Sequence, residues 1–89
     1  MEHLAVDLGG MKSQVCVRSP EGAILEEREI PTLQLRKWLS TRPQSRVILE
    51  TCSEAFRIAD GALEHGHEVR VVPATLVRSL GIGSRRTRG

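Results

Sequence analysis

Two carboxylates, Asp7 and Glu50, each end a short aliphatic run of the chain. Asp7 follows residues 4–6, and Glu50 follows residues 47–49. Such runs are typical of buried β-strands, and ligands gather at the carboxyl ends of parallel strands in open α/β sheets. Two carboxylates placed together there repel each other unless a divalent cation lies between them. The pair therefore predicts a metal site of the kind that supports phosphoryl chemistry on nucleic acid.

Other residues with metal-binding chemistry give weaker signals. Cys16 and Cys52 lie far apart and outside any C-x-x-C pattern, so we expect reduced thiols in apolar surroundings. His65 and His67 flank Gly66, where a helix is expected to end, and no third ligand lies near them in the sequence. We therefore do not expect these two histidines to form a metal site. Asp7 and Glu50 also have an ordinary explanation, as acids at the ends of strands.

The length and composition indicate one small domain. The 89 residues include one Trp, one Phe and no Tyr, so aliphatic side chains must build the core. Scarce aromatic residues argue against a platform that stacks the bases of single-stranded nucleic acid. The sequence has no apolar run of membrane-spanning length and no signal-peptide pattern, so we expect a cytoplasmic protein without a membrane partner.

Positive charge is concentrated at the C-terminal end. All 11 acidic side chains lie within residues 1–68, whereas every charged side chain in residues 69–89 is basic. Arginine forks match phosphate oxygens, which makes this end a candidate for binding nucleic acid. The predicted contacts are Lys12, Arg78, Arg85, Arg86 and Arg88. A solvated tail, or arginine favoured by a GC-rich genome, would explain the same pattern.

Strands and a helix are expected in the first half of the chain. The predicted strands are residues 3–7, 13–18 and 23–30, joined as an antiparallel meander. In the third strand, Ile24 and Ile30 should share one face and Glu27 and Glu29 the other. A helix over 33–41 should follow, capped by Thr32. Its apolar face is expected to contain Leu35, Trp38 and Leu39.

The second half continues with alternating strands and helices. The predicted strands are 47–50 and 69–72, with a short helical segment over 74–80. Thr51 and Glu54 match a capping box for the helix between the two strands. That helix should bury Phe56, Ala59 and Leu63 and end at Gly66 in a left-handed conformation.

The order of these elements is βββαβαβ, which predicts an α/β fold with a mixed five-stranded sheet and helices packed on it. Right-handed crossovers would place the fourth and fifth strands parallel to the first, as in the RNase H-like (RuvC-like) sheet. Asp7 and Glu50 would then emerge side by side at one edge of the sheet. We assign residues 1–83 to the domain and 84–89 to a basic tail.

Three segments, in this order and spacing, resemble one known family. They are residues 5–9, 47–52 and 66–74. The chain is similar to the N-terminal RuvC-like domain of the DEDD-type insertion-sequence transposases, and the resemblance covers essentially its whole length. Residues 76–81 also resemble the family segment that leads to the third and fourth acidic residues.

The resemblance implies an RNase H-like fold, a Mg²⁺ or Mn²⁺ site, and a role in DNA strand cleavage and transfer with RNA-guided target choice. By position, Asp7 matches the first acid of the family and Glu50 the second, so both would be catalytic and metal-binding. The family places two further aspartates after a basic run, and these 89 residues contain neither. We therefore expect a truncated domain that is inactive alone and holds metal weakly or not at all. In a prokaryote the full protein would be associated with the nucleoid.

Two other functions stay open. The Asp-Leu-Gly-Gly turn at residues 7–10 also opens the phosphate loop of actin-like sugar kinases, whose first domain starts with the same meander. That reading predicts an ATP-binding half-domain, but a second phosphate loop and an adenosine motif do not occur in the sequence. The third function is a non-catalytic nucleic-acid-binding or assembly module, in which uncovered apolar sheet surface supports a homo-oligomer.

Overall fold

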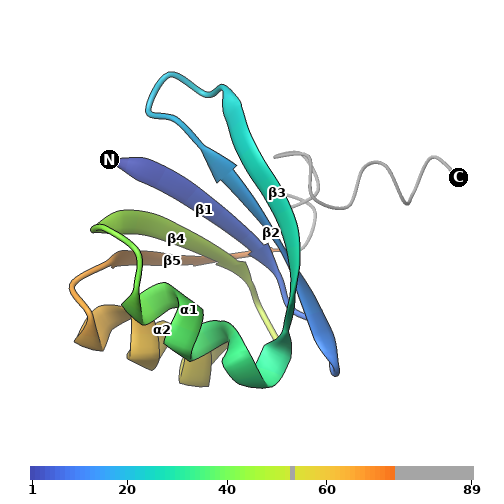
Figure 1. Ribbon diagram of the computed structural model, residues 1–89. Coiled ribbons are helices and arrows are strands. Elements are labelled where there is room, and N and C mark those ends of the chain that lie inside the picture. The colour runs from blue at the N-terminus through green and yellow to red at the C-terminus, as the bar shows by residue number, and fades with distance from the viewer. Residues whose placement is uncertain (53, 74–89) are drawn as a thin grey trace, which may run out of the picture.

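The computed structural model describes residues 1–52 and 54–73 (Figure 1). Its elements, in chain order, are β1 (Glu2–Asp7), β2 (Lys12–Arg18), β3 (Ile24–Pro31), the 3-10 turn η1 (Thr32–Gln34), α1 (Leu35–Ser40), β4 (Ser45–Glu50), α2 (Ala55–Glu64) and β5 (Glu68–Val72). The five strands form one mixed sheet in the order β3-β2-β1-β4-β5. β1, β2 and β3 make an antiparallel meander, while β4 is parallel to β1 and β5 to β4. The predicted α/β fold with a mixed five-stranded sheet is therefore confirmed.

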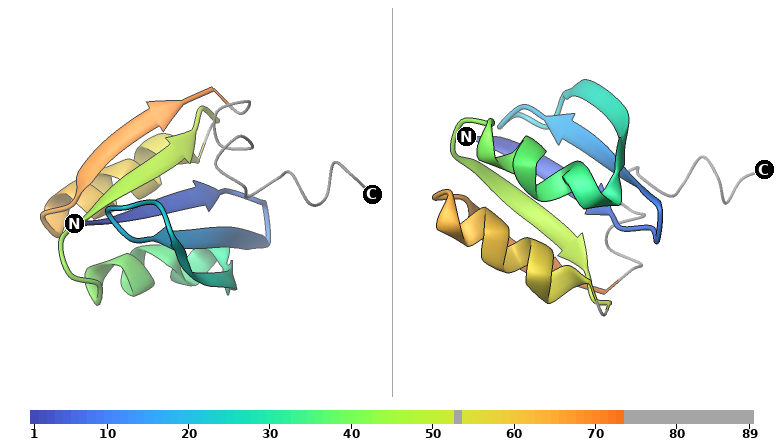
Figure 2. Two further views of the ribbon diagram at one scale, coloured as in Figure 1. Left: turned by 90° about the horizontal axis from the view of Figure 1, so that it is seen from above. Right: turned by 60° about the horizontal axis from the view of Figure 1, so that its bottom comes forward.

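Both helices cover the same face of the sheet (Figure 2), and the main core lies between this face and the helices. Alternate residues of the strands point into this core, as the pleat requires. The largest fully buried apolar side chains are Leu4, Val6, Val15, Val17, Leu35, Leu39, Val47, Leu49 and Ile58. The opposite face has a small cluster of its own, in which Val72 packs against the buried Ala5 and Cys16. Cys16 is thus a buried free thiol, as expected, whereas Cys52 is half-buried.

Two predicted faces were partly wrong. Ile30 is buried, but Ile24 is 53% exposed, because the register between β2 and β3 shifts at Val17 and Arg18, opposite Ile24. In α2, Ala59 is buried as predicted, but Phe56 and Leu63 are exposed. The buried stripe of α2 is instead built mainly from small residues, Ala55, Ala59, Gly61 and Ala62, together with Ile58. Small residues let the helix approach the sheet closely, and a pattern weighted toward large apolar residues misses them.

Both predicted helix starts were also wrong. Thr32 does not cap α1: it opens η1, and its hydroxyl donates to the Gly9 carbonyl (2.7 Å). Thr51 does not cap α2 either, because its hydroxyl bonds the Val72 carbonyl (3.3 Å) and the N-cap residue is Glu54, whose side chain makes no capping hydrogen bond. In both places the hydroxyl bonds a backbone carbonyl far away in the sequence instead of capping the helix that follows it. The predicted end of α2 is confirmed, since Gly66 has φ +83°.

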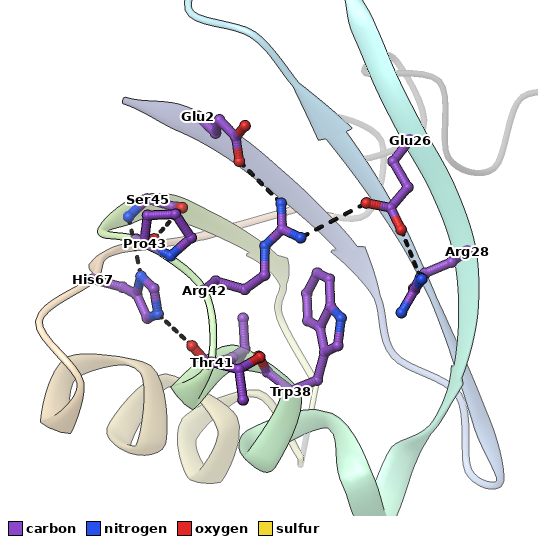
Figure 3. Close-up of polar contacts among 10 residues, drawn as sticks. Glu2, Glu26, Arg28, Trp38, Thr41, Arg42, Pro43, Ser45 and His67 are labelled. Atoms are coloured by element: carbon purple, nitrogen blue, oxygen red, sulfur yellow. Dashed lines mark hydrogen bonds and ion pairs between the residues drawn. The ribbon is translucent and has the colours of Figure 1, made fainter.

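His67 ties β4 to α1 in the interior (Figure 3). The backbone N–H of Ser45 donates to Nδ1 of His67 at 3.0 Å, and Nε2 lies 2.7 Å from the Leu39 carbonyl oxygen. Because a backbone N–H can only donate, Nδ1 must accept, so the hydrogen is on Nε2 and is donated to Leu39. The side chain is buried and both of its ring nitrogens are satisfied. His67 therefore has a structural role in this part of the chain, linking β4 to α1.

Arg42 joins three segments just after the C-terminal end of α1 (Figure 3). Its guanidinium lies over the Trp38 ring, 4.9 Å from the centroid, and forms ion pairs with Glu2 (3.0 Å) and Glu26 (3.7 Å). The arginine side chain is only 21% exposed, so solvent screens these contacts less than it would at an open surface. The cluster fixes α1 against β1 and β3.

We expect Arg42→Ala to lower the free energy of unfolding by about 1–2 kcal/mol, since it removes two charge-assisted contacts and a cation–π contact together. Arg57→Ala is the matched control, because Arg57 makes an exposed ion pair with Glu54, the N-cap residue of its own helix α2. That substitution should cost less than about 0.5 kcal/mol. Urea denaturation followed by circular dichroism measures both. Equal losses would show that the Arg42 cluster adds no more than a surface pair.

Candidate functional site

The parallel pairing of β1 with β4 brings Asp7 and Glu50 to the same edge of the sheet. Val6 pairs with Leu49 at the end of the shared ladder, so the two acids occupy the next position on each strand. Neighbouring strands are about 4.8 Å apart. The two carboxylates thus extend from adjacent positions at the carboxyl ends of parallel strands, where the sequence placed them.

Both acids also lie on the same face of the sheet, the one without helices. Leu4, Val6, Val47 and Leu49 belong to the main core, and side chains alternate along a strand. Asp7 therefore shares the face of Ala5, and Glu50 that of Ile48. Both acids are half-buried.

The pair belongs to a polar row that crosses four strands of the sheet, β3, β2, β1 and β4. Gln14 is the register partner of Asp7 on β2, and Glu29 is the partner of Gln14 on β3. At the other end, Val72 of β5 is the partner of Glu50. The sequence pattern placed Glu29 on one face of the third predicted strand without relating it to Asp7, and it gave no role to Gln14. Both residues could have been found from the sequence, because the register of a tight meander determines which residues of β2 and β3 lie beside Asp7.

The loop after Asp7 is held by a closed ring of hydrogen bonds. The Gly9 N–H donates to Ser13 Oγ (3.4 Å), Ser13 Oγ lies 2.8 Å from Thr32 Oγ1, and Thr32 Oγ1 donates to the Gly9 carbonyl (2.7 Å). Since Thr32 uses its hydrogen on Gly9, Ser13 must donate to Thr32. Ser13 and Thr32 are both buried. The buried hydroxyls therefore hold the loop at Gly9, two residues after Asp7. This restricts the direction in which the chain leaves β1 at Asp7.

The close approach at Gly9 leaves no room for a side chain. A Cβ there would lie 2.2 Å from the Lys12 carbonyl oxygen, whereas one at Gly10 would meet no atom of residues 1–52 and 54–73 within 4 Å. The tight part of the Asp-Leu-Gly-Gly turn is thus its first glycine.

Of the predicted nucleic-acid contacts, Lys12 lies in the described part of the chain. It opens β2 on the face of Asp7 and forms an exposed ion pair with Glu29 (3.6 Å). A cation is thus present beside the polar row. The other four contacts, Arg78, Arg85, Arg86 and Arg88, fall outside the described residues, as do the helical segment predicted over 74–80 and the basic tail over 84–89.

Within residues 1–52 and 54–73, no group of three or more His, Cys, Asp or Glu side chains is arranged to hold a metal ion. Asp7 and Glu50 are two carboxylates, so any ion between them would need further ligands from water, phosphate or other residues. A surface hollow of about 550 Å³ lies along β3 and the neighbouring part of β2. Its lining includes Gln14 and Glu29, so one end of the hollow reaches the polar row.

Comparison with known proteins adds no assignment. No protein-family model matches the chain, and no curated protein matches it significantly. In the described residues, neither helix has the length and apolar character needed to cross a bilayer.

Proposed function

We propose that this chain is an RNase H-like domain of a DEDD-type DNA transposase, in which Asp7 and Glu50 supply two ligands to a Mg²⁺ or Mn²⁺ ion. The observation that carries the proposal is the parallel β1–β4 register, which sets the two acids at adjacent strand ends on one face. The sheet order β3-β2-β1-β4-β5 and the antiparallel meander also agree with the arrangement that such a domain requires.

The donor set fits a hard divalent cation, because both side chains offer carboxylate oxygens. A metal ion bound there would polarise a scissile phosphate and activate the attacking oxygen. The task of the protein residues is to hold and orient: the ring of Ser13, Thr32 and Gly9 fixes the loop after Asp7, while the β4–β5 pairing fixes Glu50 opposite Val72. Lys12, on the same face, is positioned to meet a DNA phosphate, which would orient the nucleic acid without reading its sequence.

The two-carboxylate set predicts weak metal binding by this chain alone, since Mg²⁺ keeps several waters and depends on further ligands or substrate phosphates. We expect Mn²⁺ titration to broaden the backbone amide NMR signals around Asp7 and Glu50 together, with a dissociation constant of about 1 mM or weaker. Asp7→Asn and Glu50→Gln should each remove the broadening at both positions, because each withdraws a ligand from one shared ion.

Asp60→Asn is the matched control, as Asp60 is an exposed acid on α2, on the other side of the sheet. This variant should titrate like the wild-type chain. Broadening that stays at one acid when the other is replaced would mean two independent surface sites and would refute the shared ion. Broadening centred on Glu26 or Glu27 of β3 would refute the proposed site as well.

The kinase-like alternative can be tested in the same experiment. It predicts that ATP shifts the amides of Gly9 and Gly10 more than metal does. The structure gives Gly9 another explanation, since its lack of a side chain is already required by the Lys12 carbonyl. We therefore expect no saturable ATP effect at these two glycines.

A further inference from the structure

The exposed side of α2, beside the outer edge of β5, is an apolar surface that the core does not use. Phe56 is 64% exposed and Leu63 is 57% exposed. The two are seven residues apart, so at about 100° per residue they lie on one stripe of the helix. Large exposed apolar side chains that line up in this way mark interaction surfaces more often than isolated ones do.

The direction of this stripe follows from the contacts of α2. Gly61 lies against Arg36 of α1, and Arg36 also bonds Glu64 (3.3 Å), so that flank of α2 faces α1. Phe56 and Leu63 lie on the opposite flank, more than a third of a turn away. Figure 2 shows α2 along the β5 side of the sheet, with α1 toward the meander. The stripe therefore overhangs the β5 edge.

The β5 edge itself is suited to pairing. Among the described residues no strand lies on its outer side. Val69 packs toward the main core, so Val71, 37% exposed, shares the helix-covered face, and Glu68 and Arg70 point to the other face. The other edge strand, β3, has four successive charged residues at 26–29, a pattern that discourages edge pairing.

We propose that this surface is a homodimer interface, in which β5 pairs with β5 of a second copy in antiparallel orientation. A two-fold axis normal to the sheet keeps the helices of both copies on one face. Charge selects the register. If Val69 pairs with Val69 of the second copy, Glu68 of each chain lies opposite Arg70 of the other. A register centred on Arg70 would instead place two arginines opposite each other, which is unfavourable.

The helices fit the same arrangement. α2 packs on both β4 and β5, so its axis lies above the gap between them. With strands about 4.8 Å apart, the two α2 axes would then be about 10 Å apart, at the upper end of the spacing of packed helices. They would run antiparallel, and Phe56 of one copy would meet Leu63 of the other. The interface is thus self-complementary in both its apolar and its charged residues.

Sedimentation velocity of the chain from low micromolar to about 1 mM tests the proposal. The wild-type chain should shift from monomer to dimer over this range. Phe56→Asp and Leu63→Asp should each raise the dimer dissociation constant by at least about thirtyfold. Leu33→Asp is the matched control, because Leu33 is an 88% exposed apolar residue on η1 and should leave association unchanged. Circular dichroism verifies that each variant is folded.

A charge-swap pair tests the register directly. Arg70→Glu and Glu68→Arg each create like charges across the two-fold, so each variant alone should be monomeric. Mixed together, they should form a heterodimer, because both cross-strand pairs regain opposite charges. Glu68→Arg also removes the exposed ion pair with Arg46, a loss that affects monomer stability only slightly. A wild-type chain that stays monomeric, a dimer that Phe56→Asp leaves intact, or a mixture that fails to associate would each overturn the proposal.

Discussion

Replacing His67 by alanine is expected to lower the free energy of unfolding by about 3–5 kcal/mol, the largest effect of any substitution considered for this chain. The imidazole satisfies the Ser45 N–H and the Leu39 carbonyl at the same time, at 3.0 and 2.7 Å. Truncation would leave both backbone groups buried without a partner and would open a cavity between β4 and α1. Each unsatisfied buried group costs about 1–3 kcal/mol. Chemical denaturation followed by circular dichroism measures the loss.

His65→Ala is the matched control. His65 is exposed and Nδ1 lies near the Gly61 carbonyl at 2.9 Å, so its loss should cost less than about 1 kcal/mol. His67→Gln provides an intermediate case, since a glutamine amide can replace one of the two hydrogen bonds but is not shaped to bridge both. We expect the order alanine, glutamine, wild type in increasing stability. If His65→Ala and His67→Ala proved equally costly, the bridge would not be the source of the effect.

Periodicity predicted the skeleton of the fold well, because strands and helices with one buried face leave a regular trace in the sequence. Val15 and Val17 share the core face of β2, and Leu35 and Leu39 that of α1, as their spacing required. The α2 face failed for a physical reason. Ala55 and Ala62 are weak hydrophobic signals on their own, yet close packing against the sheet buries them instead of Phe56 and Leu63.

The sequence predicted that Asp7 and Glu50 lie side by side, but it did not predict the hydrogen bonds that hold the segments next to them. Strand ends can be read from an aliphatic run followed by an acid, and parallel pairing then places Asp7 beside Glu50. The hydroxyls of Thr32 and Thr51 looked like helix caps because capping is a local signal. Their partners, Gly9 and Val72, are far away in sequence, and no local pattern identifies such partners.

Alanine in place of Gly9 is expected to lower the free energy of unfolding by about 2–3 kcal/mol. The new Cβ would lie 2.2 Å from the Lys12 carbonyl oxygen, a backbone atom that cannot turn aside as a side chain would. The turn must therefore open, and opening it breaks the ring through Ser13 and Thr32. We expect amide shifts from Asp7 to Lys12 by NMR, together with weaker Mn²⁺ broadening at Glu50, because Asp7 no longer leaves β1 in the same direction.

Gly10→Ala is the control, one residue away in the same turn. A Cβ at Gly10 meets no atom within 4 Å in the described part of the chain, and the backbone there is not in the left-handed region, so stability should change by less than about 0.5 kcal/mol. The pair also separates the two readings of the Asp-Leu-Gly-Gly turn. If the glycines served a bound phosphate, Gly10→Ala would abolish an ATP response that the wild-type chain shows. If the turn serves to hold Asp7, only Gly9→Ala has a large effect, and its effect is seen in stability and metal binding without any nucleotide present.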